Sequence, residues 1–141
     1  MKILHIESGR HLYGGAQQVS YLLRHLPPGR VESVLLADPR SPLREVCESE
    51  RIPFLPLRIK GDLDPALPLK LRRAFAEARP DLVHIHSRKG VDLWSGWLAR
   101  GAGIPAVISR RVDNPEPGLL ARWKYGTYDR VIAISDGIRR V

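Results

Sequence analysis

Six short runs rich in isoleucine, valine and leucine recur along the chain, and amphipathic segments separate them. Most runs are apolar almost throughout, whereas a strand with one wet face would alternate apolar and polar residues. The pattern therefore indicates parallel strands that are covered on both faces. The predicted strands are Lys2 to Ser8, Val31 to Ala37, Phe54 to Ile59, Asp81 to Ser87, Ala106 to Arg111, and Arg130 to Ser135.

The segments between these runs have the features of helices. Ser41-Pro42 and Asp64-Pro65 each place a capping residue and a proline at the start of a helix. Strands that alternate with helices of this length predict right-handed βαβ crossovers. We expect a Rossmann-like doubly wound parallel sheet in a three-layer α/β/α domain. The first helix shows the apolar spacing i, i+3, i+4, i+7 in Val19, Leu22, Leu23 and Leu26.

Two later segments place aromatic and aliphatic residues at helical spacing. Trp94, Trp97 and Leu98 would share one helix face, and Leu120 and Trp123 another. We interpret both sets as core stripes.

The chain is long enough for one globular domain over residues 1–141, and 43% of its residues are hydrophobic. Its formal net charge of +8 suggests an anionic partner, which could be nucleic acid, an acidic membrane surface or a phosphorylated small molecule. We set nucleic acid aside, because the cations are spread over loops and one helix without a nucleic-acid-binding signature.

The sequence contains no apolar run long enough to span a membrane, and Glu7 interrupts the segment that a signal peptide would need. We expect a cytoplasmic protein. The lone cysteine, Cys47, follows Leu43 and Val46 on an apolar helical stripe, which favours a buried hydrophobic role over a nucleophile.

One predicted helix has a basic face. Its cations are interspersed with Leu67, Leu69 and Phe75, so this face would either lie on anionic lipid or be solvated. The cations are Lys70, Arg72, Arg73 and Arg79.

Ligands of open parallel sheets bind outside the carboxyl ends of the strands. After the first strand, Gly14, Gly15 and Ala16 stand where a helix should begin, a position at which backbone N–H groups can approach a phosphate. The spacing matches neither the dinucleotide-binding nor the P-loop pattern. The alternative is a flexible connection.

Basic and polar residues follow the other strands at the same edge. Guanidinium and ammonium groups suit phosphate oxygens, although some of these cations would only be solvated. The cations are Arg10, Arg88, Lys89, Arg110 and Arg111, and Asp113 and Ser135 are among the polar residues near them.

His84 and His86 are two residues apart on one strand and therefore share a face of the sheet. Because no further ligand has suitable spacing nearby, we favour hydrogen-bonded histidines over a metal site and expect no metal. His86 is nearer the ligand edge, where it would contact substrate or act as a base. His5 and His25 are interpreted as structural.

Three segments stand in a characteristic order along the chain: Gly14-Gly15-Ala16-Gln17, the strand from Arg79 to His86, and the strand from Asp129 to Ile138. Together they resemble the amino-terminal domain of family 4 glycosyltransferases. Val107 to Asp113 adds a similarity to bacterial members that build cell-surface polysaccharides.

The resemblance implies one half of a GT-B architecture, in which two Rossmann-like domains face a cleft. The second domain would hold most of a nucleotide-sugar donor, and sugar transfer would retain the anomeric configuration without a metal or other cofactor. This chain would bind a saccharide or lipid-linked acceptor and lie in the cytoplasm, either free or peripheral to the inner face of the membrane. Gly14, Gly15 and Ala16 would approach the donor phosphates. The acceptor side would be lined by His86, Arg88, Lys89, Arg110, Arg111, Asp113 and Ser135.

The sequence also departs from the family pattern. The paired-glutamate motif of the second domain is absent, and Ser109-Arg110-Arg111 stands where many relatives have a sugar-contacting histidine. The chain ends a few residues into a predicted helix, which suggests truncation. We therefore expect no catalysis from this chain alone. The alternatives are a non-catalytic Rossmann-like module that binds a nucleotide or phosphosugar, and a gene remnant.

Overall fold

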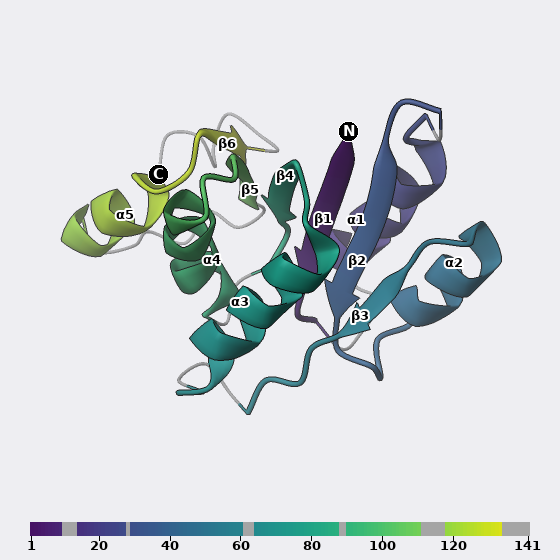
Figure 1. Cartoon of the computed structure of the whole chain (residues 1–141), viewed down its shortest axis with the longest axis horizontal. Helices are drawn as coiled ribbons and strands as arrows, with labels where there is room; N and C mark the ends of the chain where they lie inside the picture. Colours follow the sequence, from purple (N-terminus) through teal and green to yellow (C-terminus); the bar gives the residue numbers. More distant parts are fainter. Residues whose placement is uncertain (10–13, 28, 61–63, 88–89, 111–117, 134–141) are drawn as a thin grey trace.

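The computed structural model describes residues 1–9, 14–27, 29–60, 64–87, 90–110 and 118–133. Within them, strands and helices alternate along the chain (Figure 1). The elements are β1 (Lys2–Glu7), α1 (Gly14–His25), β2 (Glu32–Ala37), α2 (Leu43–Glu50), β3 (Phe54–Pro56), α3 (Leu67–Ala78), β4 (Leu82–Ile85), α4 (Val91–Gly101), β5 (Ala106–Arg110), α5 (Gly118–Tyr125) and β6 (Arg130–Ala133).

The six described strands form one parallel sheet in the order β3-β2-β1-β4-β5-β6. The chain starts at the centre, proceeds outward to β3, and returns to place β4 on the other side of β1. Leu4 of β1 is thus paired with Val34 of β2 and with Val83 of β4. This order confirms the predicted Rossmann-like doubly wound sheet.

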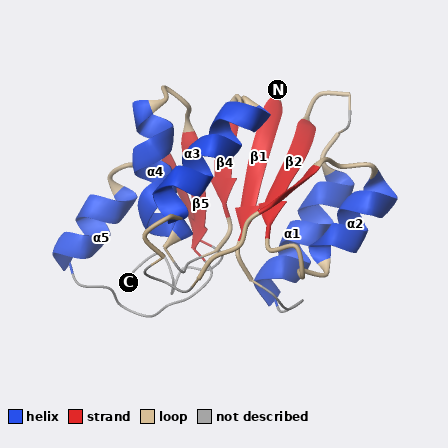
Figure 2. Cartoon of the chain, turned by 60° about the horizontal axis from the view of Figure 1, so that its bottom comes forward, coloured by secondary structure: helices blue, strands red, loops and turns tan. Residues whose placement is uncertain are grey.

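Helices cover the sheet on both faces, as Figure 2 shows. Leu4 and Ile6 of β1 pack in a core with Leu71 and Phe75 of α3 and Val91 of α4. On the other face, residues of β2 such as Leu35 pack against α1 and α2. Because successive side chains of a strand point to opposite faces, one apolar run supplies both cores.

The structure ends β3 earlier than the sequence predicts. The expected strand covers 54–59, but the observed one is Phe54–Pro56. Pro56 has no N–H to donate to a neighbouring strand, and β3 lies at the edge of the sheet, where such a residue is tolerated.

Polar side chains just before α2 and α3 accept hydrogen bonds from backbone amides at the starts of these helices. Ser41 Oγ accepts a hydrogen bond from the Leu43 amide at 3.2 Å, and Asp64 Oδ1 accepts one from the Ala66 amide at 2.9 Å. The other carboxylate oxygen of Asp64 binds the Lys70 ammonium at 2.9 Å. Hydrogen bonds from the Lys60 amide, Lys70 and Ala66 lower the pKa of Asp64 to about 2. Both predicted helix starts are thus supported by local hydrogen bonds.

A buried ion pair attaches α5 to α4. Lys124 Nζ lies 2.9 Å from Asp92 Oδ2, and both side chains are almost fully buried. The Tyr128 hydroxyl donates to the backbone carbonyl of Asp92. These contacts fix the orientation of α5 relative to α4.

The tryptophans do not form the core stripes that the sequence suggested. Trp94, Trp97 and Trp123 are 37%, 40% and 42% exposed, and Leu120 is 44% exposed. The sheet-facing side of α4 is instead occupied by small residues, among them Ser95 and Ala99, which let the helix approach the sheet closely.

Replacing Gly96 with alanine should disrupt the close contact between α4 and the segment that follows α5. A Cβ at this position would collide with the Thr127 hydroxyl and lie 2.9 Å from Thr127 Cβ. We expect Gly96→Ala to lower the free energy of unfolding by about 2 kcal/mol, as overpacking usually does. Chemical denaturation measures this change.

Gly101→Ala is the matched control on the same helix, because nothing lies within 4 Å of its added Cβ. The control should change the free energy of unfolding by less than about 1 kcal/mol. Equal effects of the two substitutions would contradict the described packing.

Candidate functional site

The carboxyl ends of β1 and β4 meet where the chain reverses its direction through the sheet. Ser87 Oγ accepts hydrogen bonds from the Ser8 amide at 2.8 Å and from the Ser8 hydroxyl at 2.9 Å. The His86 amide donates to the Ile6 carbonyl at 2.9 Å. In doubly wound sheets this reversal opens the crevice in which ligands bind.

The predicted phosphate-binding residues stand at the start of a helix. Gly14 and Gly15 are the first residues of α1, and Ala16 is buried in the core beneath it. On the strand side of this connection, Glu7 is buried and its Oε1 accepts a hydrogen bond from the Gly9 amide at 2.9 Å. Glu7 thus fixes the direction in which the chain leaves β1.

Two predicted acceptor-side residues lie at the same edge of the sheet. His86 directly follows β4 and is 4% exposed. Arg110 is the last residue of β5, which is the next strand in the sheet. The strand order therefore brings the backbone positions of Gly14, His86 and Arg110 to one edge. The predicted residues Arg88, Lys89, Arg111, Asp113 and Ser135 lie outside the described residues.

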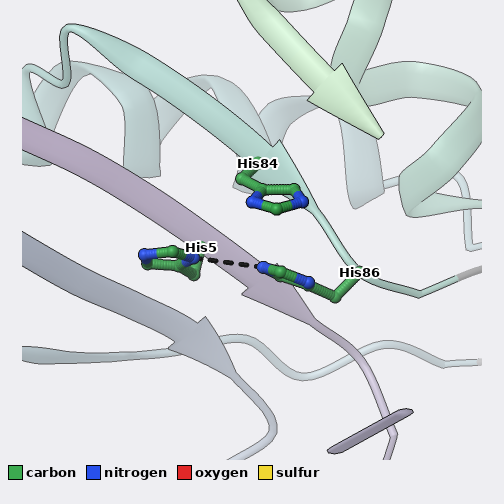
Figure 3. Close-up of side chains that lie close together, drawn as sticks. All are labelled: His5, His84 and His86. Atoms are coloured by element: carbon green, nitrogen blue, oxygen red, sulfur yellow. Dashed lines mark hydrogen bonds between the residues drawn. The ribbon is translucent and has the colours of Figure 1, made fainter. Parts of the chain in front are cut away.

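Three histidines lie together on one face of the sheet, as Figure 3 shows. His5 Nδ1 and His86 Nε2 are hydrogen-bonded at 3.1 Å. The rings of His84 and His86 are in contact, with centroids 3.8 Å apart, and His84 Nε2 is hydrogen-bonded to Ser109 Oγ at 2.7 Å. The predicted shared face of His84 and His86 is confirmed, and His5, which sequence spacing did not connect with them, lies beside them. Parallel pairing of His5 with His84 brings the third ring into place.

Burial keeps His5 neutral. Its side chain is inaccessible to solvent, and burial together with the neighbouring His84 lowers the pKa of His5 to about 3. A neutral imidazole has one N–H, so the hydrogen bond of His5 to His86 helps to set the orientation of the His86 ring at the carboxyl end of β4.

The same three side chains are the candidate metal ligands among the residues that the structure describes. Their nitrogen atoms all lie within 4.8 Å of one another. Tetrahedral zinc places its ligand nitrogens about 3.3 Å apart, so the cluster would have to contract to bind the ion. Without such a change, His5 and His86 are hydrogen-bonded to each other and His84 is hydrogen-bonded to Ser109. The absence of a metal remains a prediction.

Cys47 has no chemistry to contribute. It is 1% exposed in the core beneath α2, and burial raises the pKa of its thiol to about 11. The predicted role as a buried hydrophobic residue is confirmed.

Sequence reasoning missed Glu7 and Ser8 as residues of this edge. Both lie in an apolar run, where a buried polar residue is itself the signal, because burial requires a hydrogen-bonding partner. Their partners, the Gly9 amide and Ser87, shape the connection between β1 and α1 and the end of β4.

Among the described helices, none combines the length and the apolar character that a membrane crossing requires.

A parallel six-stranded sheet that helices cover on both faces defines a Rossmann-like α/β domain. Residues 13–140 match the family described as Glycosyl transferase 4-like domain, and the chain belongs to this family. The predicted resemblance to family 4 glycosyltransferases is thereby confirmed. A search of the curated proteins gave no match.

Solved structures of low sequence identity share the fold. Anabaena Alr3699/HepE in complex with UDP-glucose superposes with a TM-score of 0.74 at 19% identity over 99% of this chain. MurG from Acinetobacter baumannii gives a TM-score of 0.70 at 16% identity over 94%. UDP-GlcNAc 2-epimerase from Methanocaldococcus jannaschii gives 0.68 at 12% identity over 99%. The chain covers 39%, 40% and 41% of these three structures, respectively.

The buried His5 should make stability depend on pH. The unfolded chain protonates this histidine near pH 6.5, whereas the folded protein does so only near pH 3. Between these values the unfolded state binds more protons, so the free energy of unfolding falls as the pH is lowered. From pH 7.5 to pH 5 the loss due to His5 is about 2 kcal/mol.

Urea denaturation of the wild type and of His5→Gln at both pH values measures this contribution. The variant should lose about 2 kcal/mol less than the wild type over this interval. An equal loss in both proteins would show that His5 is not a buried neutral imidazole. His25→Gln is the matched control, because His25 is exposed.

Proposed function

We propose that this chain is the acceptor-binding half of a retaining glycosyltransferase that uses a nucleotide-sugar donor. The proposal rests on one juxtaposition. The glycine pair at the start of α1, His86 after β4 and Arg110 at the end of β5 stand at one edge of a domain of the Glycosyl transferase 4-like family. The low coverage of the solved structures supports a second domain that completes the cleft.

The donor class follows from the glycine pair and from the structural neighbours. Backbone N–H groups at the start of α1 suit the phosphates of a nucleotide-sugar. HepE is described in complex with UDP-glucose, and MnaA from S. aureus in complex with UDP. We assign Gly14, Gly15 and Ala16 to the donor phosphates, whereas the second domain holds the rest of the donor.

The acceptor is a saccharide or lipid-linked saccharide of cell-envelope polysaccharide synthesis. His86 contacts a sugar hydroxyl, and Lys89, Arg110, Arg111 and Arg88 neutralise phosphate or acidic groups of the acceptor, with Asp113 and Ser135 as hydrogen-bonding partners. The enzyme works without a metal, on the cytoplasmic side of the membrane and in peripheral contact with it. The chain positions the two substrates, and cations with backbone amides stabilise the leaving diphosphate.

Charge reversal at the acceptor edge tests this assignment in the full-length protein. We expect Arg110→Glu and Lys89→Glu each to raise the acceptor KM by about tenfold or more, because a repelling carboxylate replaces a phosphate ligand. Radiolabelled sugar transfer from a panel of nucleotide-sugars to lipid-linked and free saccharides provides the measurement.

Arg30→Glu is the control, since Arg30 is an exposed cation before the amino end of β2, at the opposite edge of the sheet. It should leave the acceptor KM unchanged. Normal transfer by both edge variants would refute the site assignment. Nucleotide-sugar binding without transfer to any acceptor would instead favour a non-catalytic binding module.

A further inference from the structure

All three tryptophans of the chain lie on one exposed surface. Trp94 and Trp97 are one turn apart on α4, and the rings of Trp97 and Trp123 of α5 are in contact, with centroids 5.2 Å apart. We call Trp94, Trp97, Trp123, Leu119 and Leu120 the tryptophan face. A soluble helix normally turns such residues toward the core.

The apolar area of this face is substantial. Leu119 is 84% exposed and Leu120 44%, and each is within one turn of Trp123. The face continues into a groove of about 440 Å³ between α3 and α4, which Phe75, Trp97 and Ile104 line together with the Arg72 side chain. Contiguous exposed apolar surface of this kind marks a docking site.

The charges around the face have one dominant sign. Two cations of α3 to α5 are neutralised internally, because Lys70 pairs with Asp64 and Lys124 with Asp92. The remaining charged residues of these helices are exposed, and four of the five are arginines. Among the described residues, the structure shows no ion pair for any of the five. They are Arg72, Arg73, Arg100, Arg122 and Glu77.

The sequence suggested the basic face of α3 as the surface for lipid contact, and the structure favours a different surface. Leu67 and Phe75 of α3 are buried, and the Lys70 ammonium donates to the Arg58 carbonyl as well as to Asp64. The exposed apolar residues lie mainly on α4 and α5 instead. Arg72 of α3 borders them, because it lines the same groove as Trp97.

We propose that the tryptophan face lies on an anionic lipid bilayer. Tryptophan favours the boundary between headgroups and acyl chains, because its ring is amphipathic. The leucines beside it would enter the acyl region, and the surrounding arginines would bind anionic headgroups. The combination of indole rings, aliphatic tips and an arginine rim matches the chemistry of that boundary.

The proposal deepens the membrane contact that is part of the proposed function, and lipid binding tests it independently of sugar transfer. A face turned to the bilayer would hold the carboxyl edge of the sheet close to a lipid-linked acceptor. The binding site at the strand ends and the docking face on the helices are different surfaces of the domain.

Co-sedimentation of the full-length protein with vesicles tests the proposal. We expect binding to phosphatidylcholine vesicles that contain 30% phosphatidylglycerol, weaker binding to pure phosphatidylcholine, and weakening by salt. Arg72→Glu/Arg100→Glu should reduce the partition coefficient by about tenfold or more without touching the apolar residues. Trp97→Gln/Trp123→Gln should reduce it similarly, with circular dichroism as the check on folding.

Tyr21→Ser and Arg30→Glu are matched controls. Tyr21 is 53% exposed on α1, which covers the opposite face of the sheet. Both controls should bind vesicles like the wild type.

Brominated lipid provides a second measurement. It should quench the tryptophan emission of the wild type more than that of the double tryptophan variant.

Equal vesicle binding by the arginine variant and the controls would overturn the proposal, as would no binding to anionic vesicles. A dimer in sedimentation velocity that the same substitutions dissociate would overturn it in favour of a second copy of the chain. Because the readout is lipid binding, a protein that binds vesicles but transfers no sugar would refute the proposed function alone.

Discussion

Parallel pairing of β1 with β4 is the contact on which the rest of this structure depends. The backbone hydrogen bonds of the pair are extended at one end by Asp81, whose carboxylate accepts from the Lys2 amide at 2.8 Å, and at the other by the Ser8–Ser87 bonds. The pair joins the two halves of the sheet, since β2 and β3 extend from β1 and β5 and β6 from β4. Its register also places His5 beside His84 and brings the two strand ends together.

Much of this arrangement could be predicted, because strands that are buried on both faces of a sheet appear in the sequence as nearly continuous apolar runs. The strand runs, the starts of α2 and α3 and the inert Cys47 all follow from local sequence. The ends of strands were predicted less accurately. The expected strand continues to Ile59, but β3 ends at Pro56. The histidine cluster could not be predicted, because it depends on a register between strands some 80 positions apart in the chain.

The tryptophans show what the periodicity of apolar residues cannot predict. Helical spacing of large apolar residues indicates a face but does not say whether protein or solvent covers it. On α4, Gly96 and Ser95 point to the packed side and the indole rings lie outside. The close contact between Gly96 of α4 and Thr127 leaves no room for a large side chain on the packed side of the helix.

Hydrogen–deuterium exchange shows whether ligands bind at the carboxyl ends of β1, β4 and β5, as we propose. The full-length protein would be compared with and without a nucleotide-sugar and the saccharide acceptor to which it transfers. We expect slower exchange in peptides that cover residues 7–17, 85–90 and 108–113, with no change at the amino ends of the strands. Protection confined to the amino ends, in peptides covering 26–33 and 102–106, would contradict it.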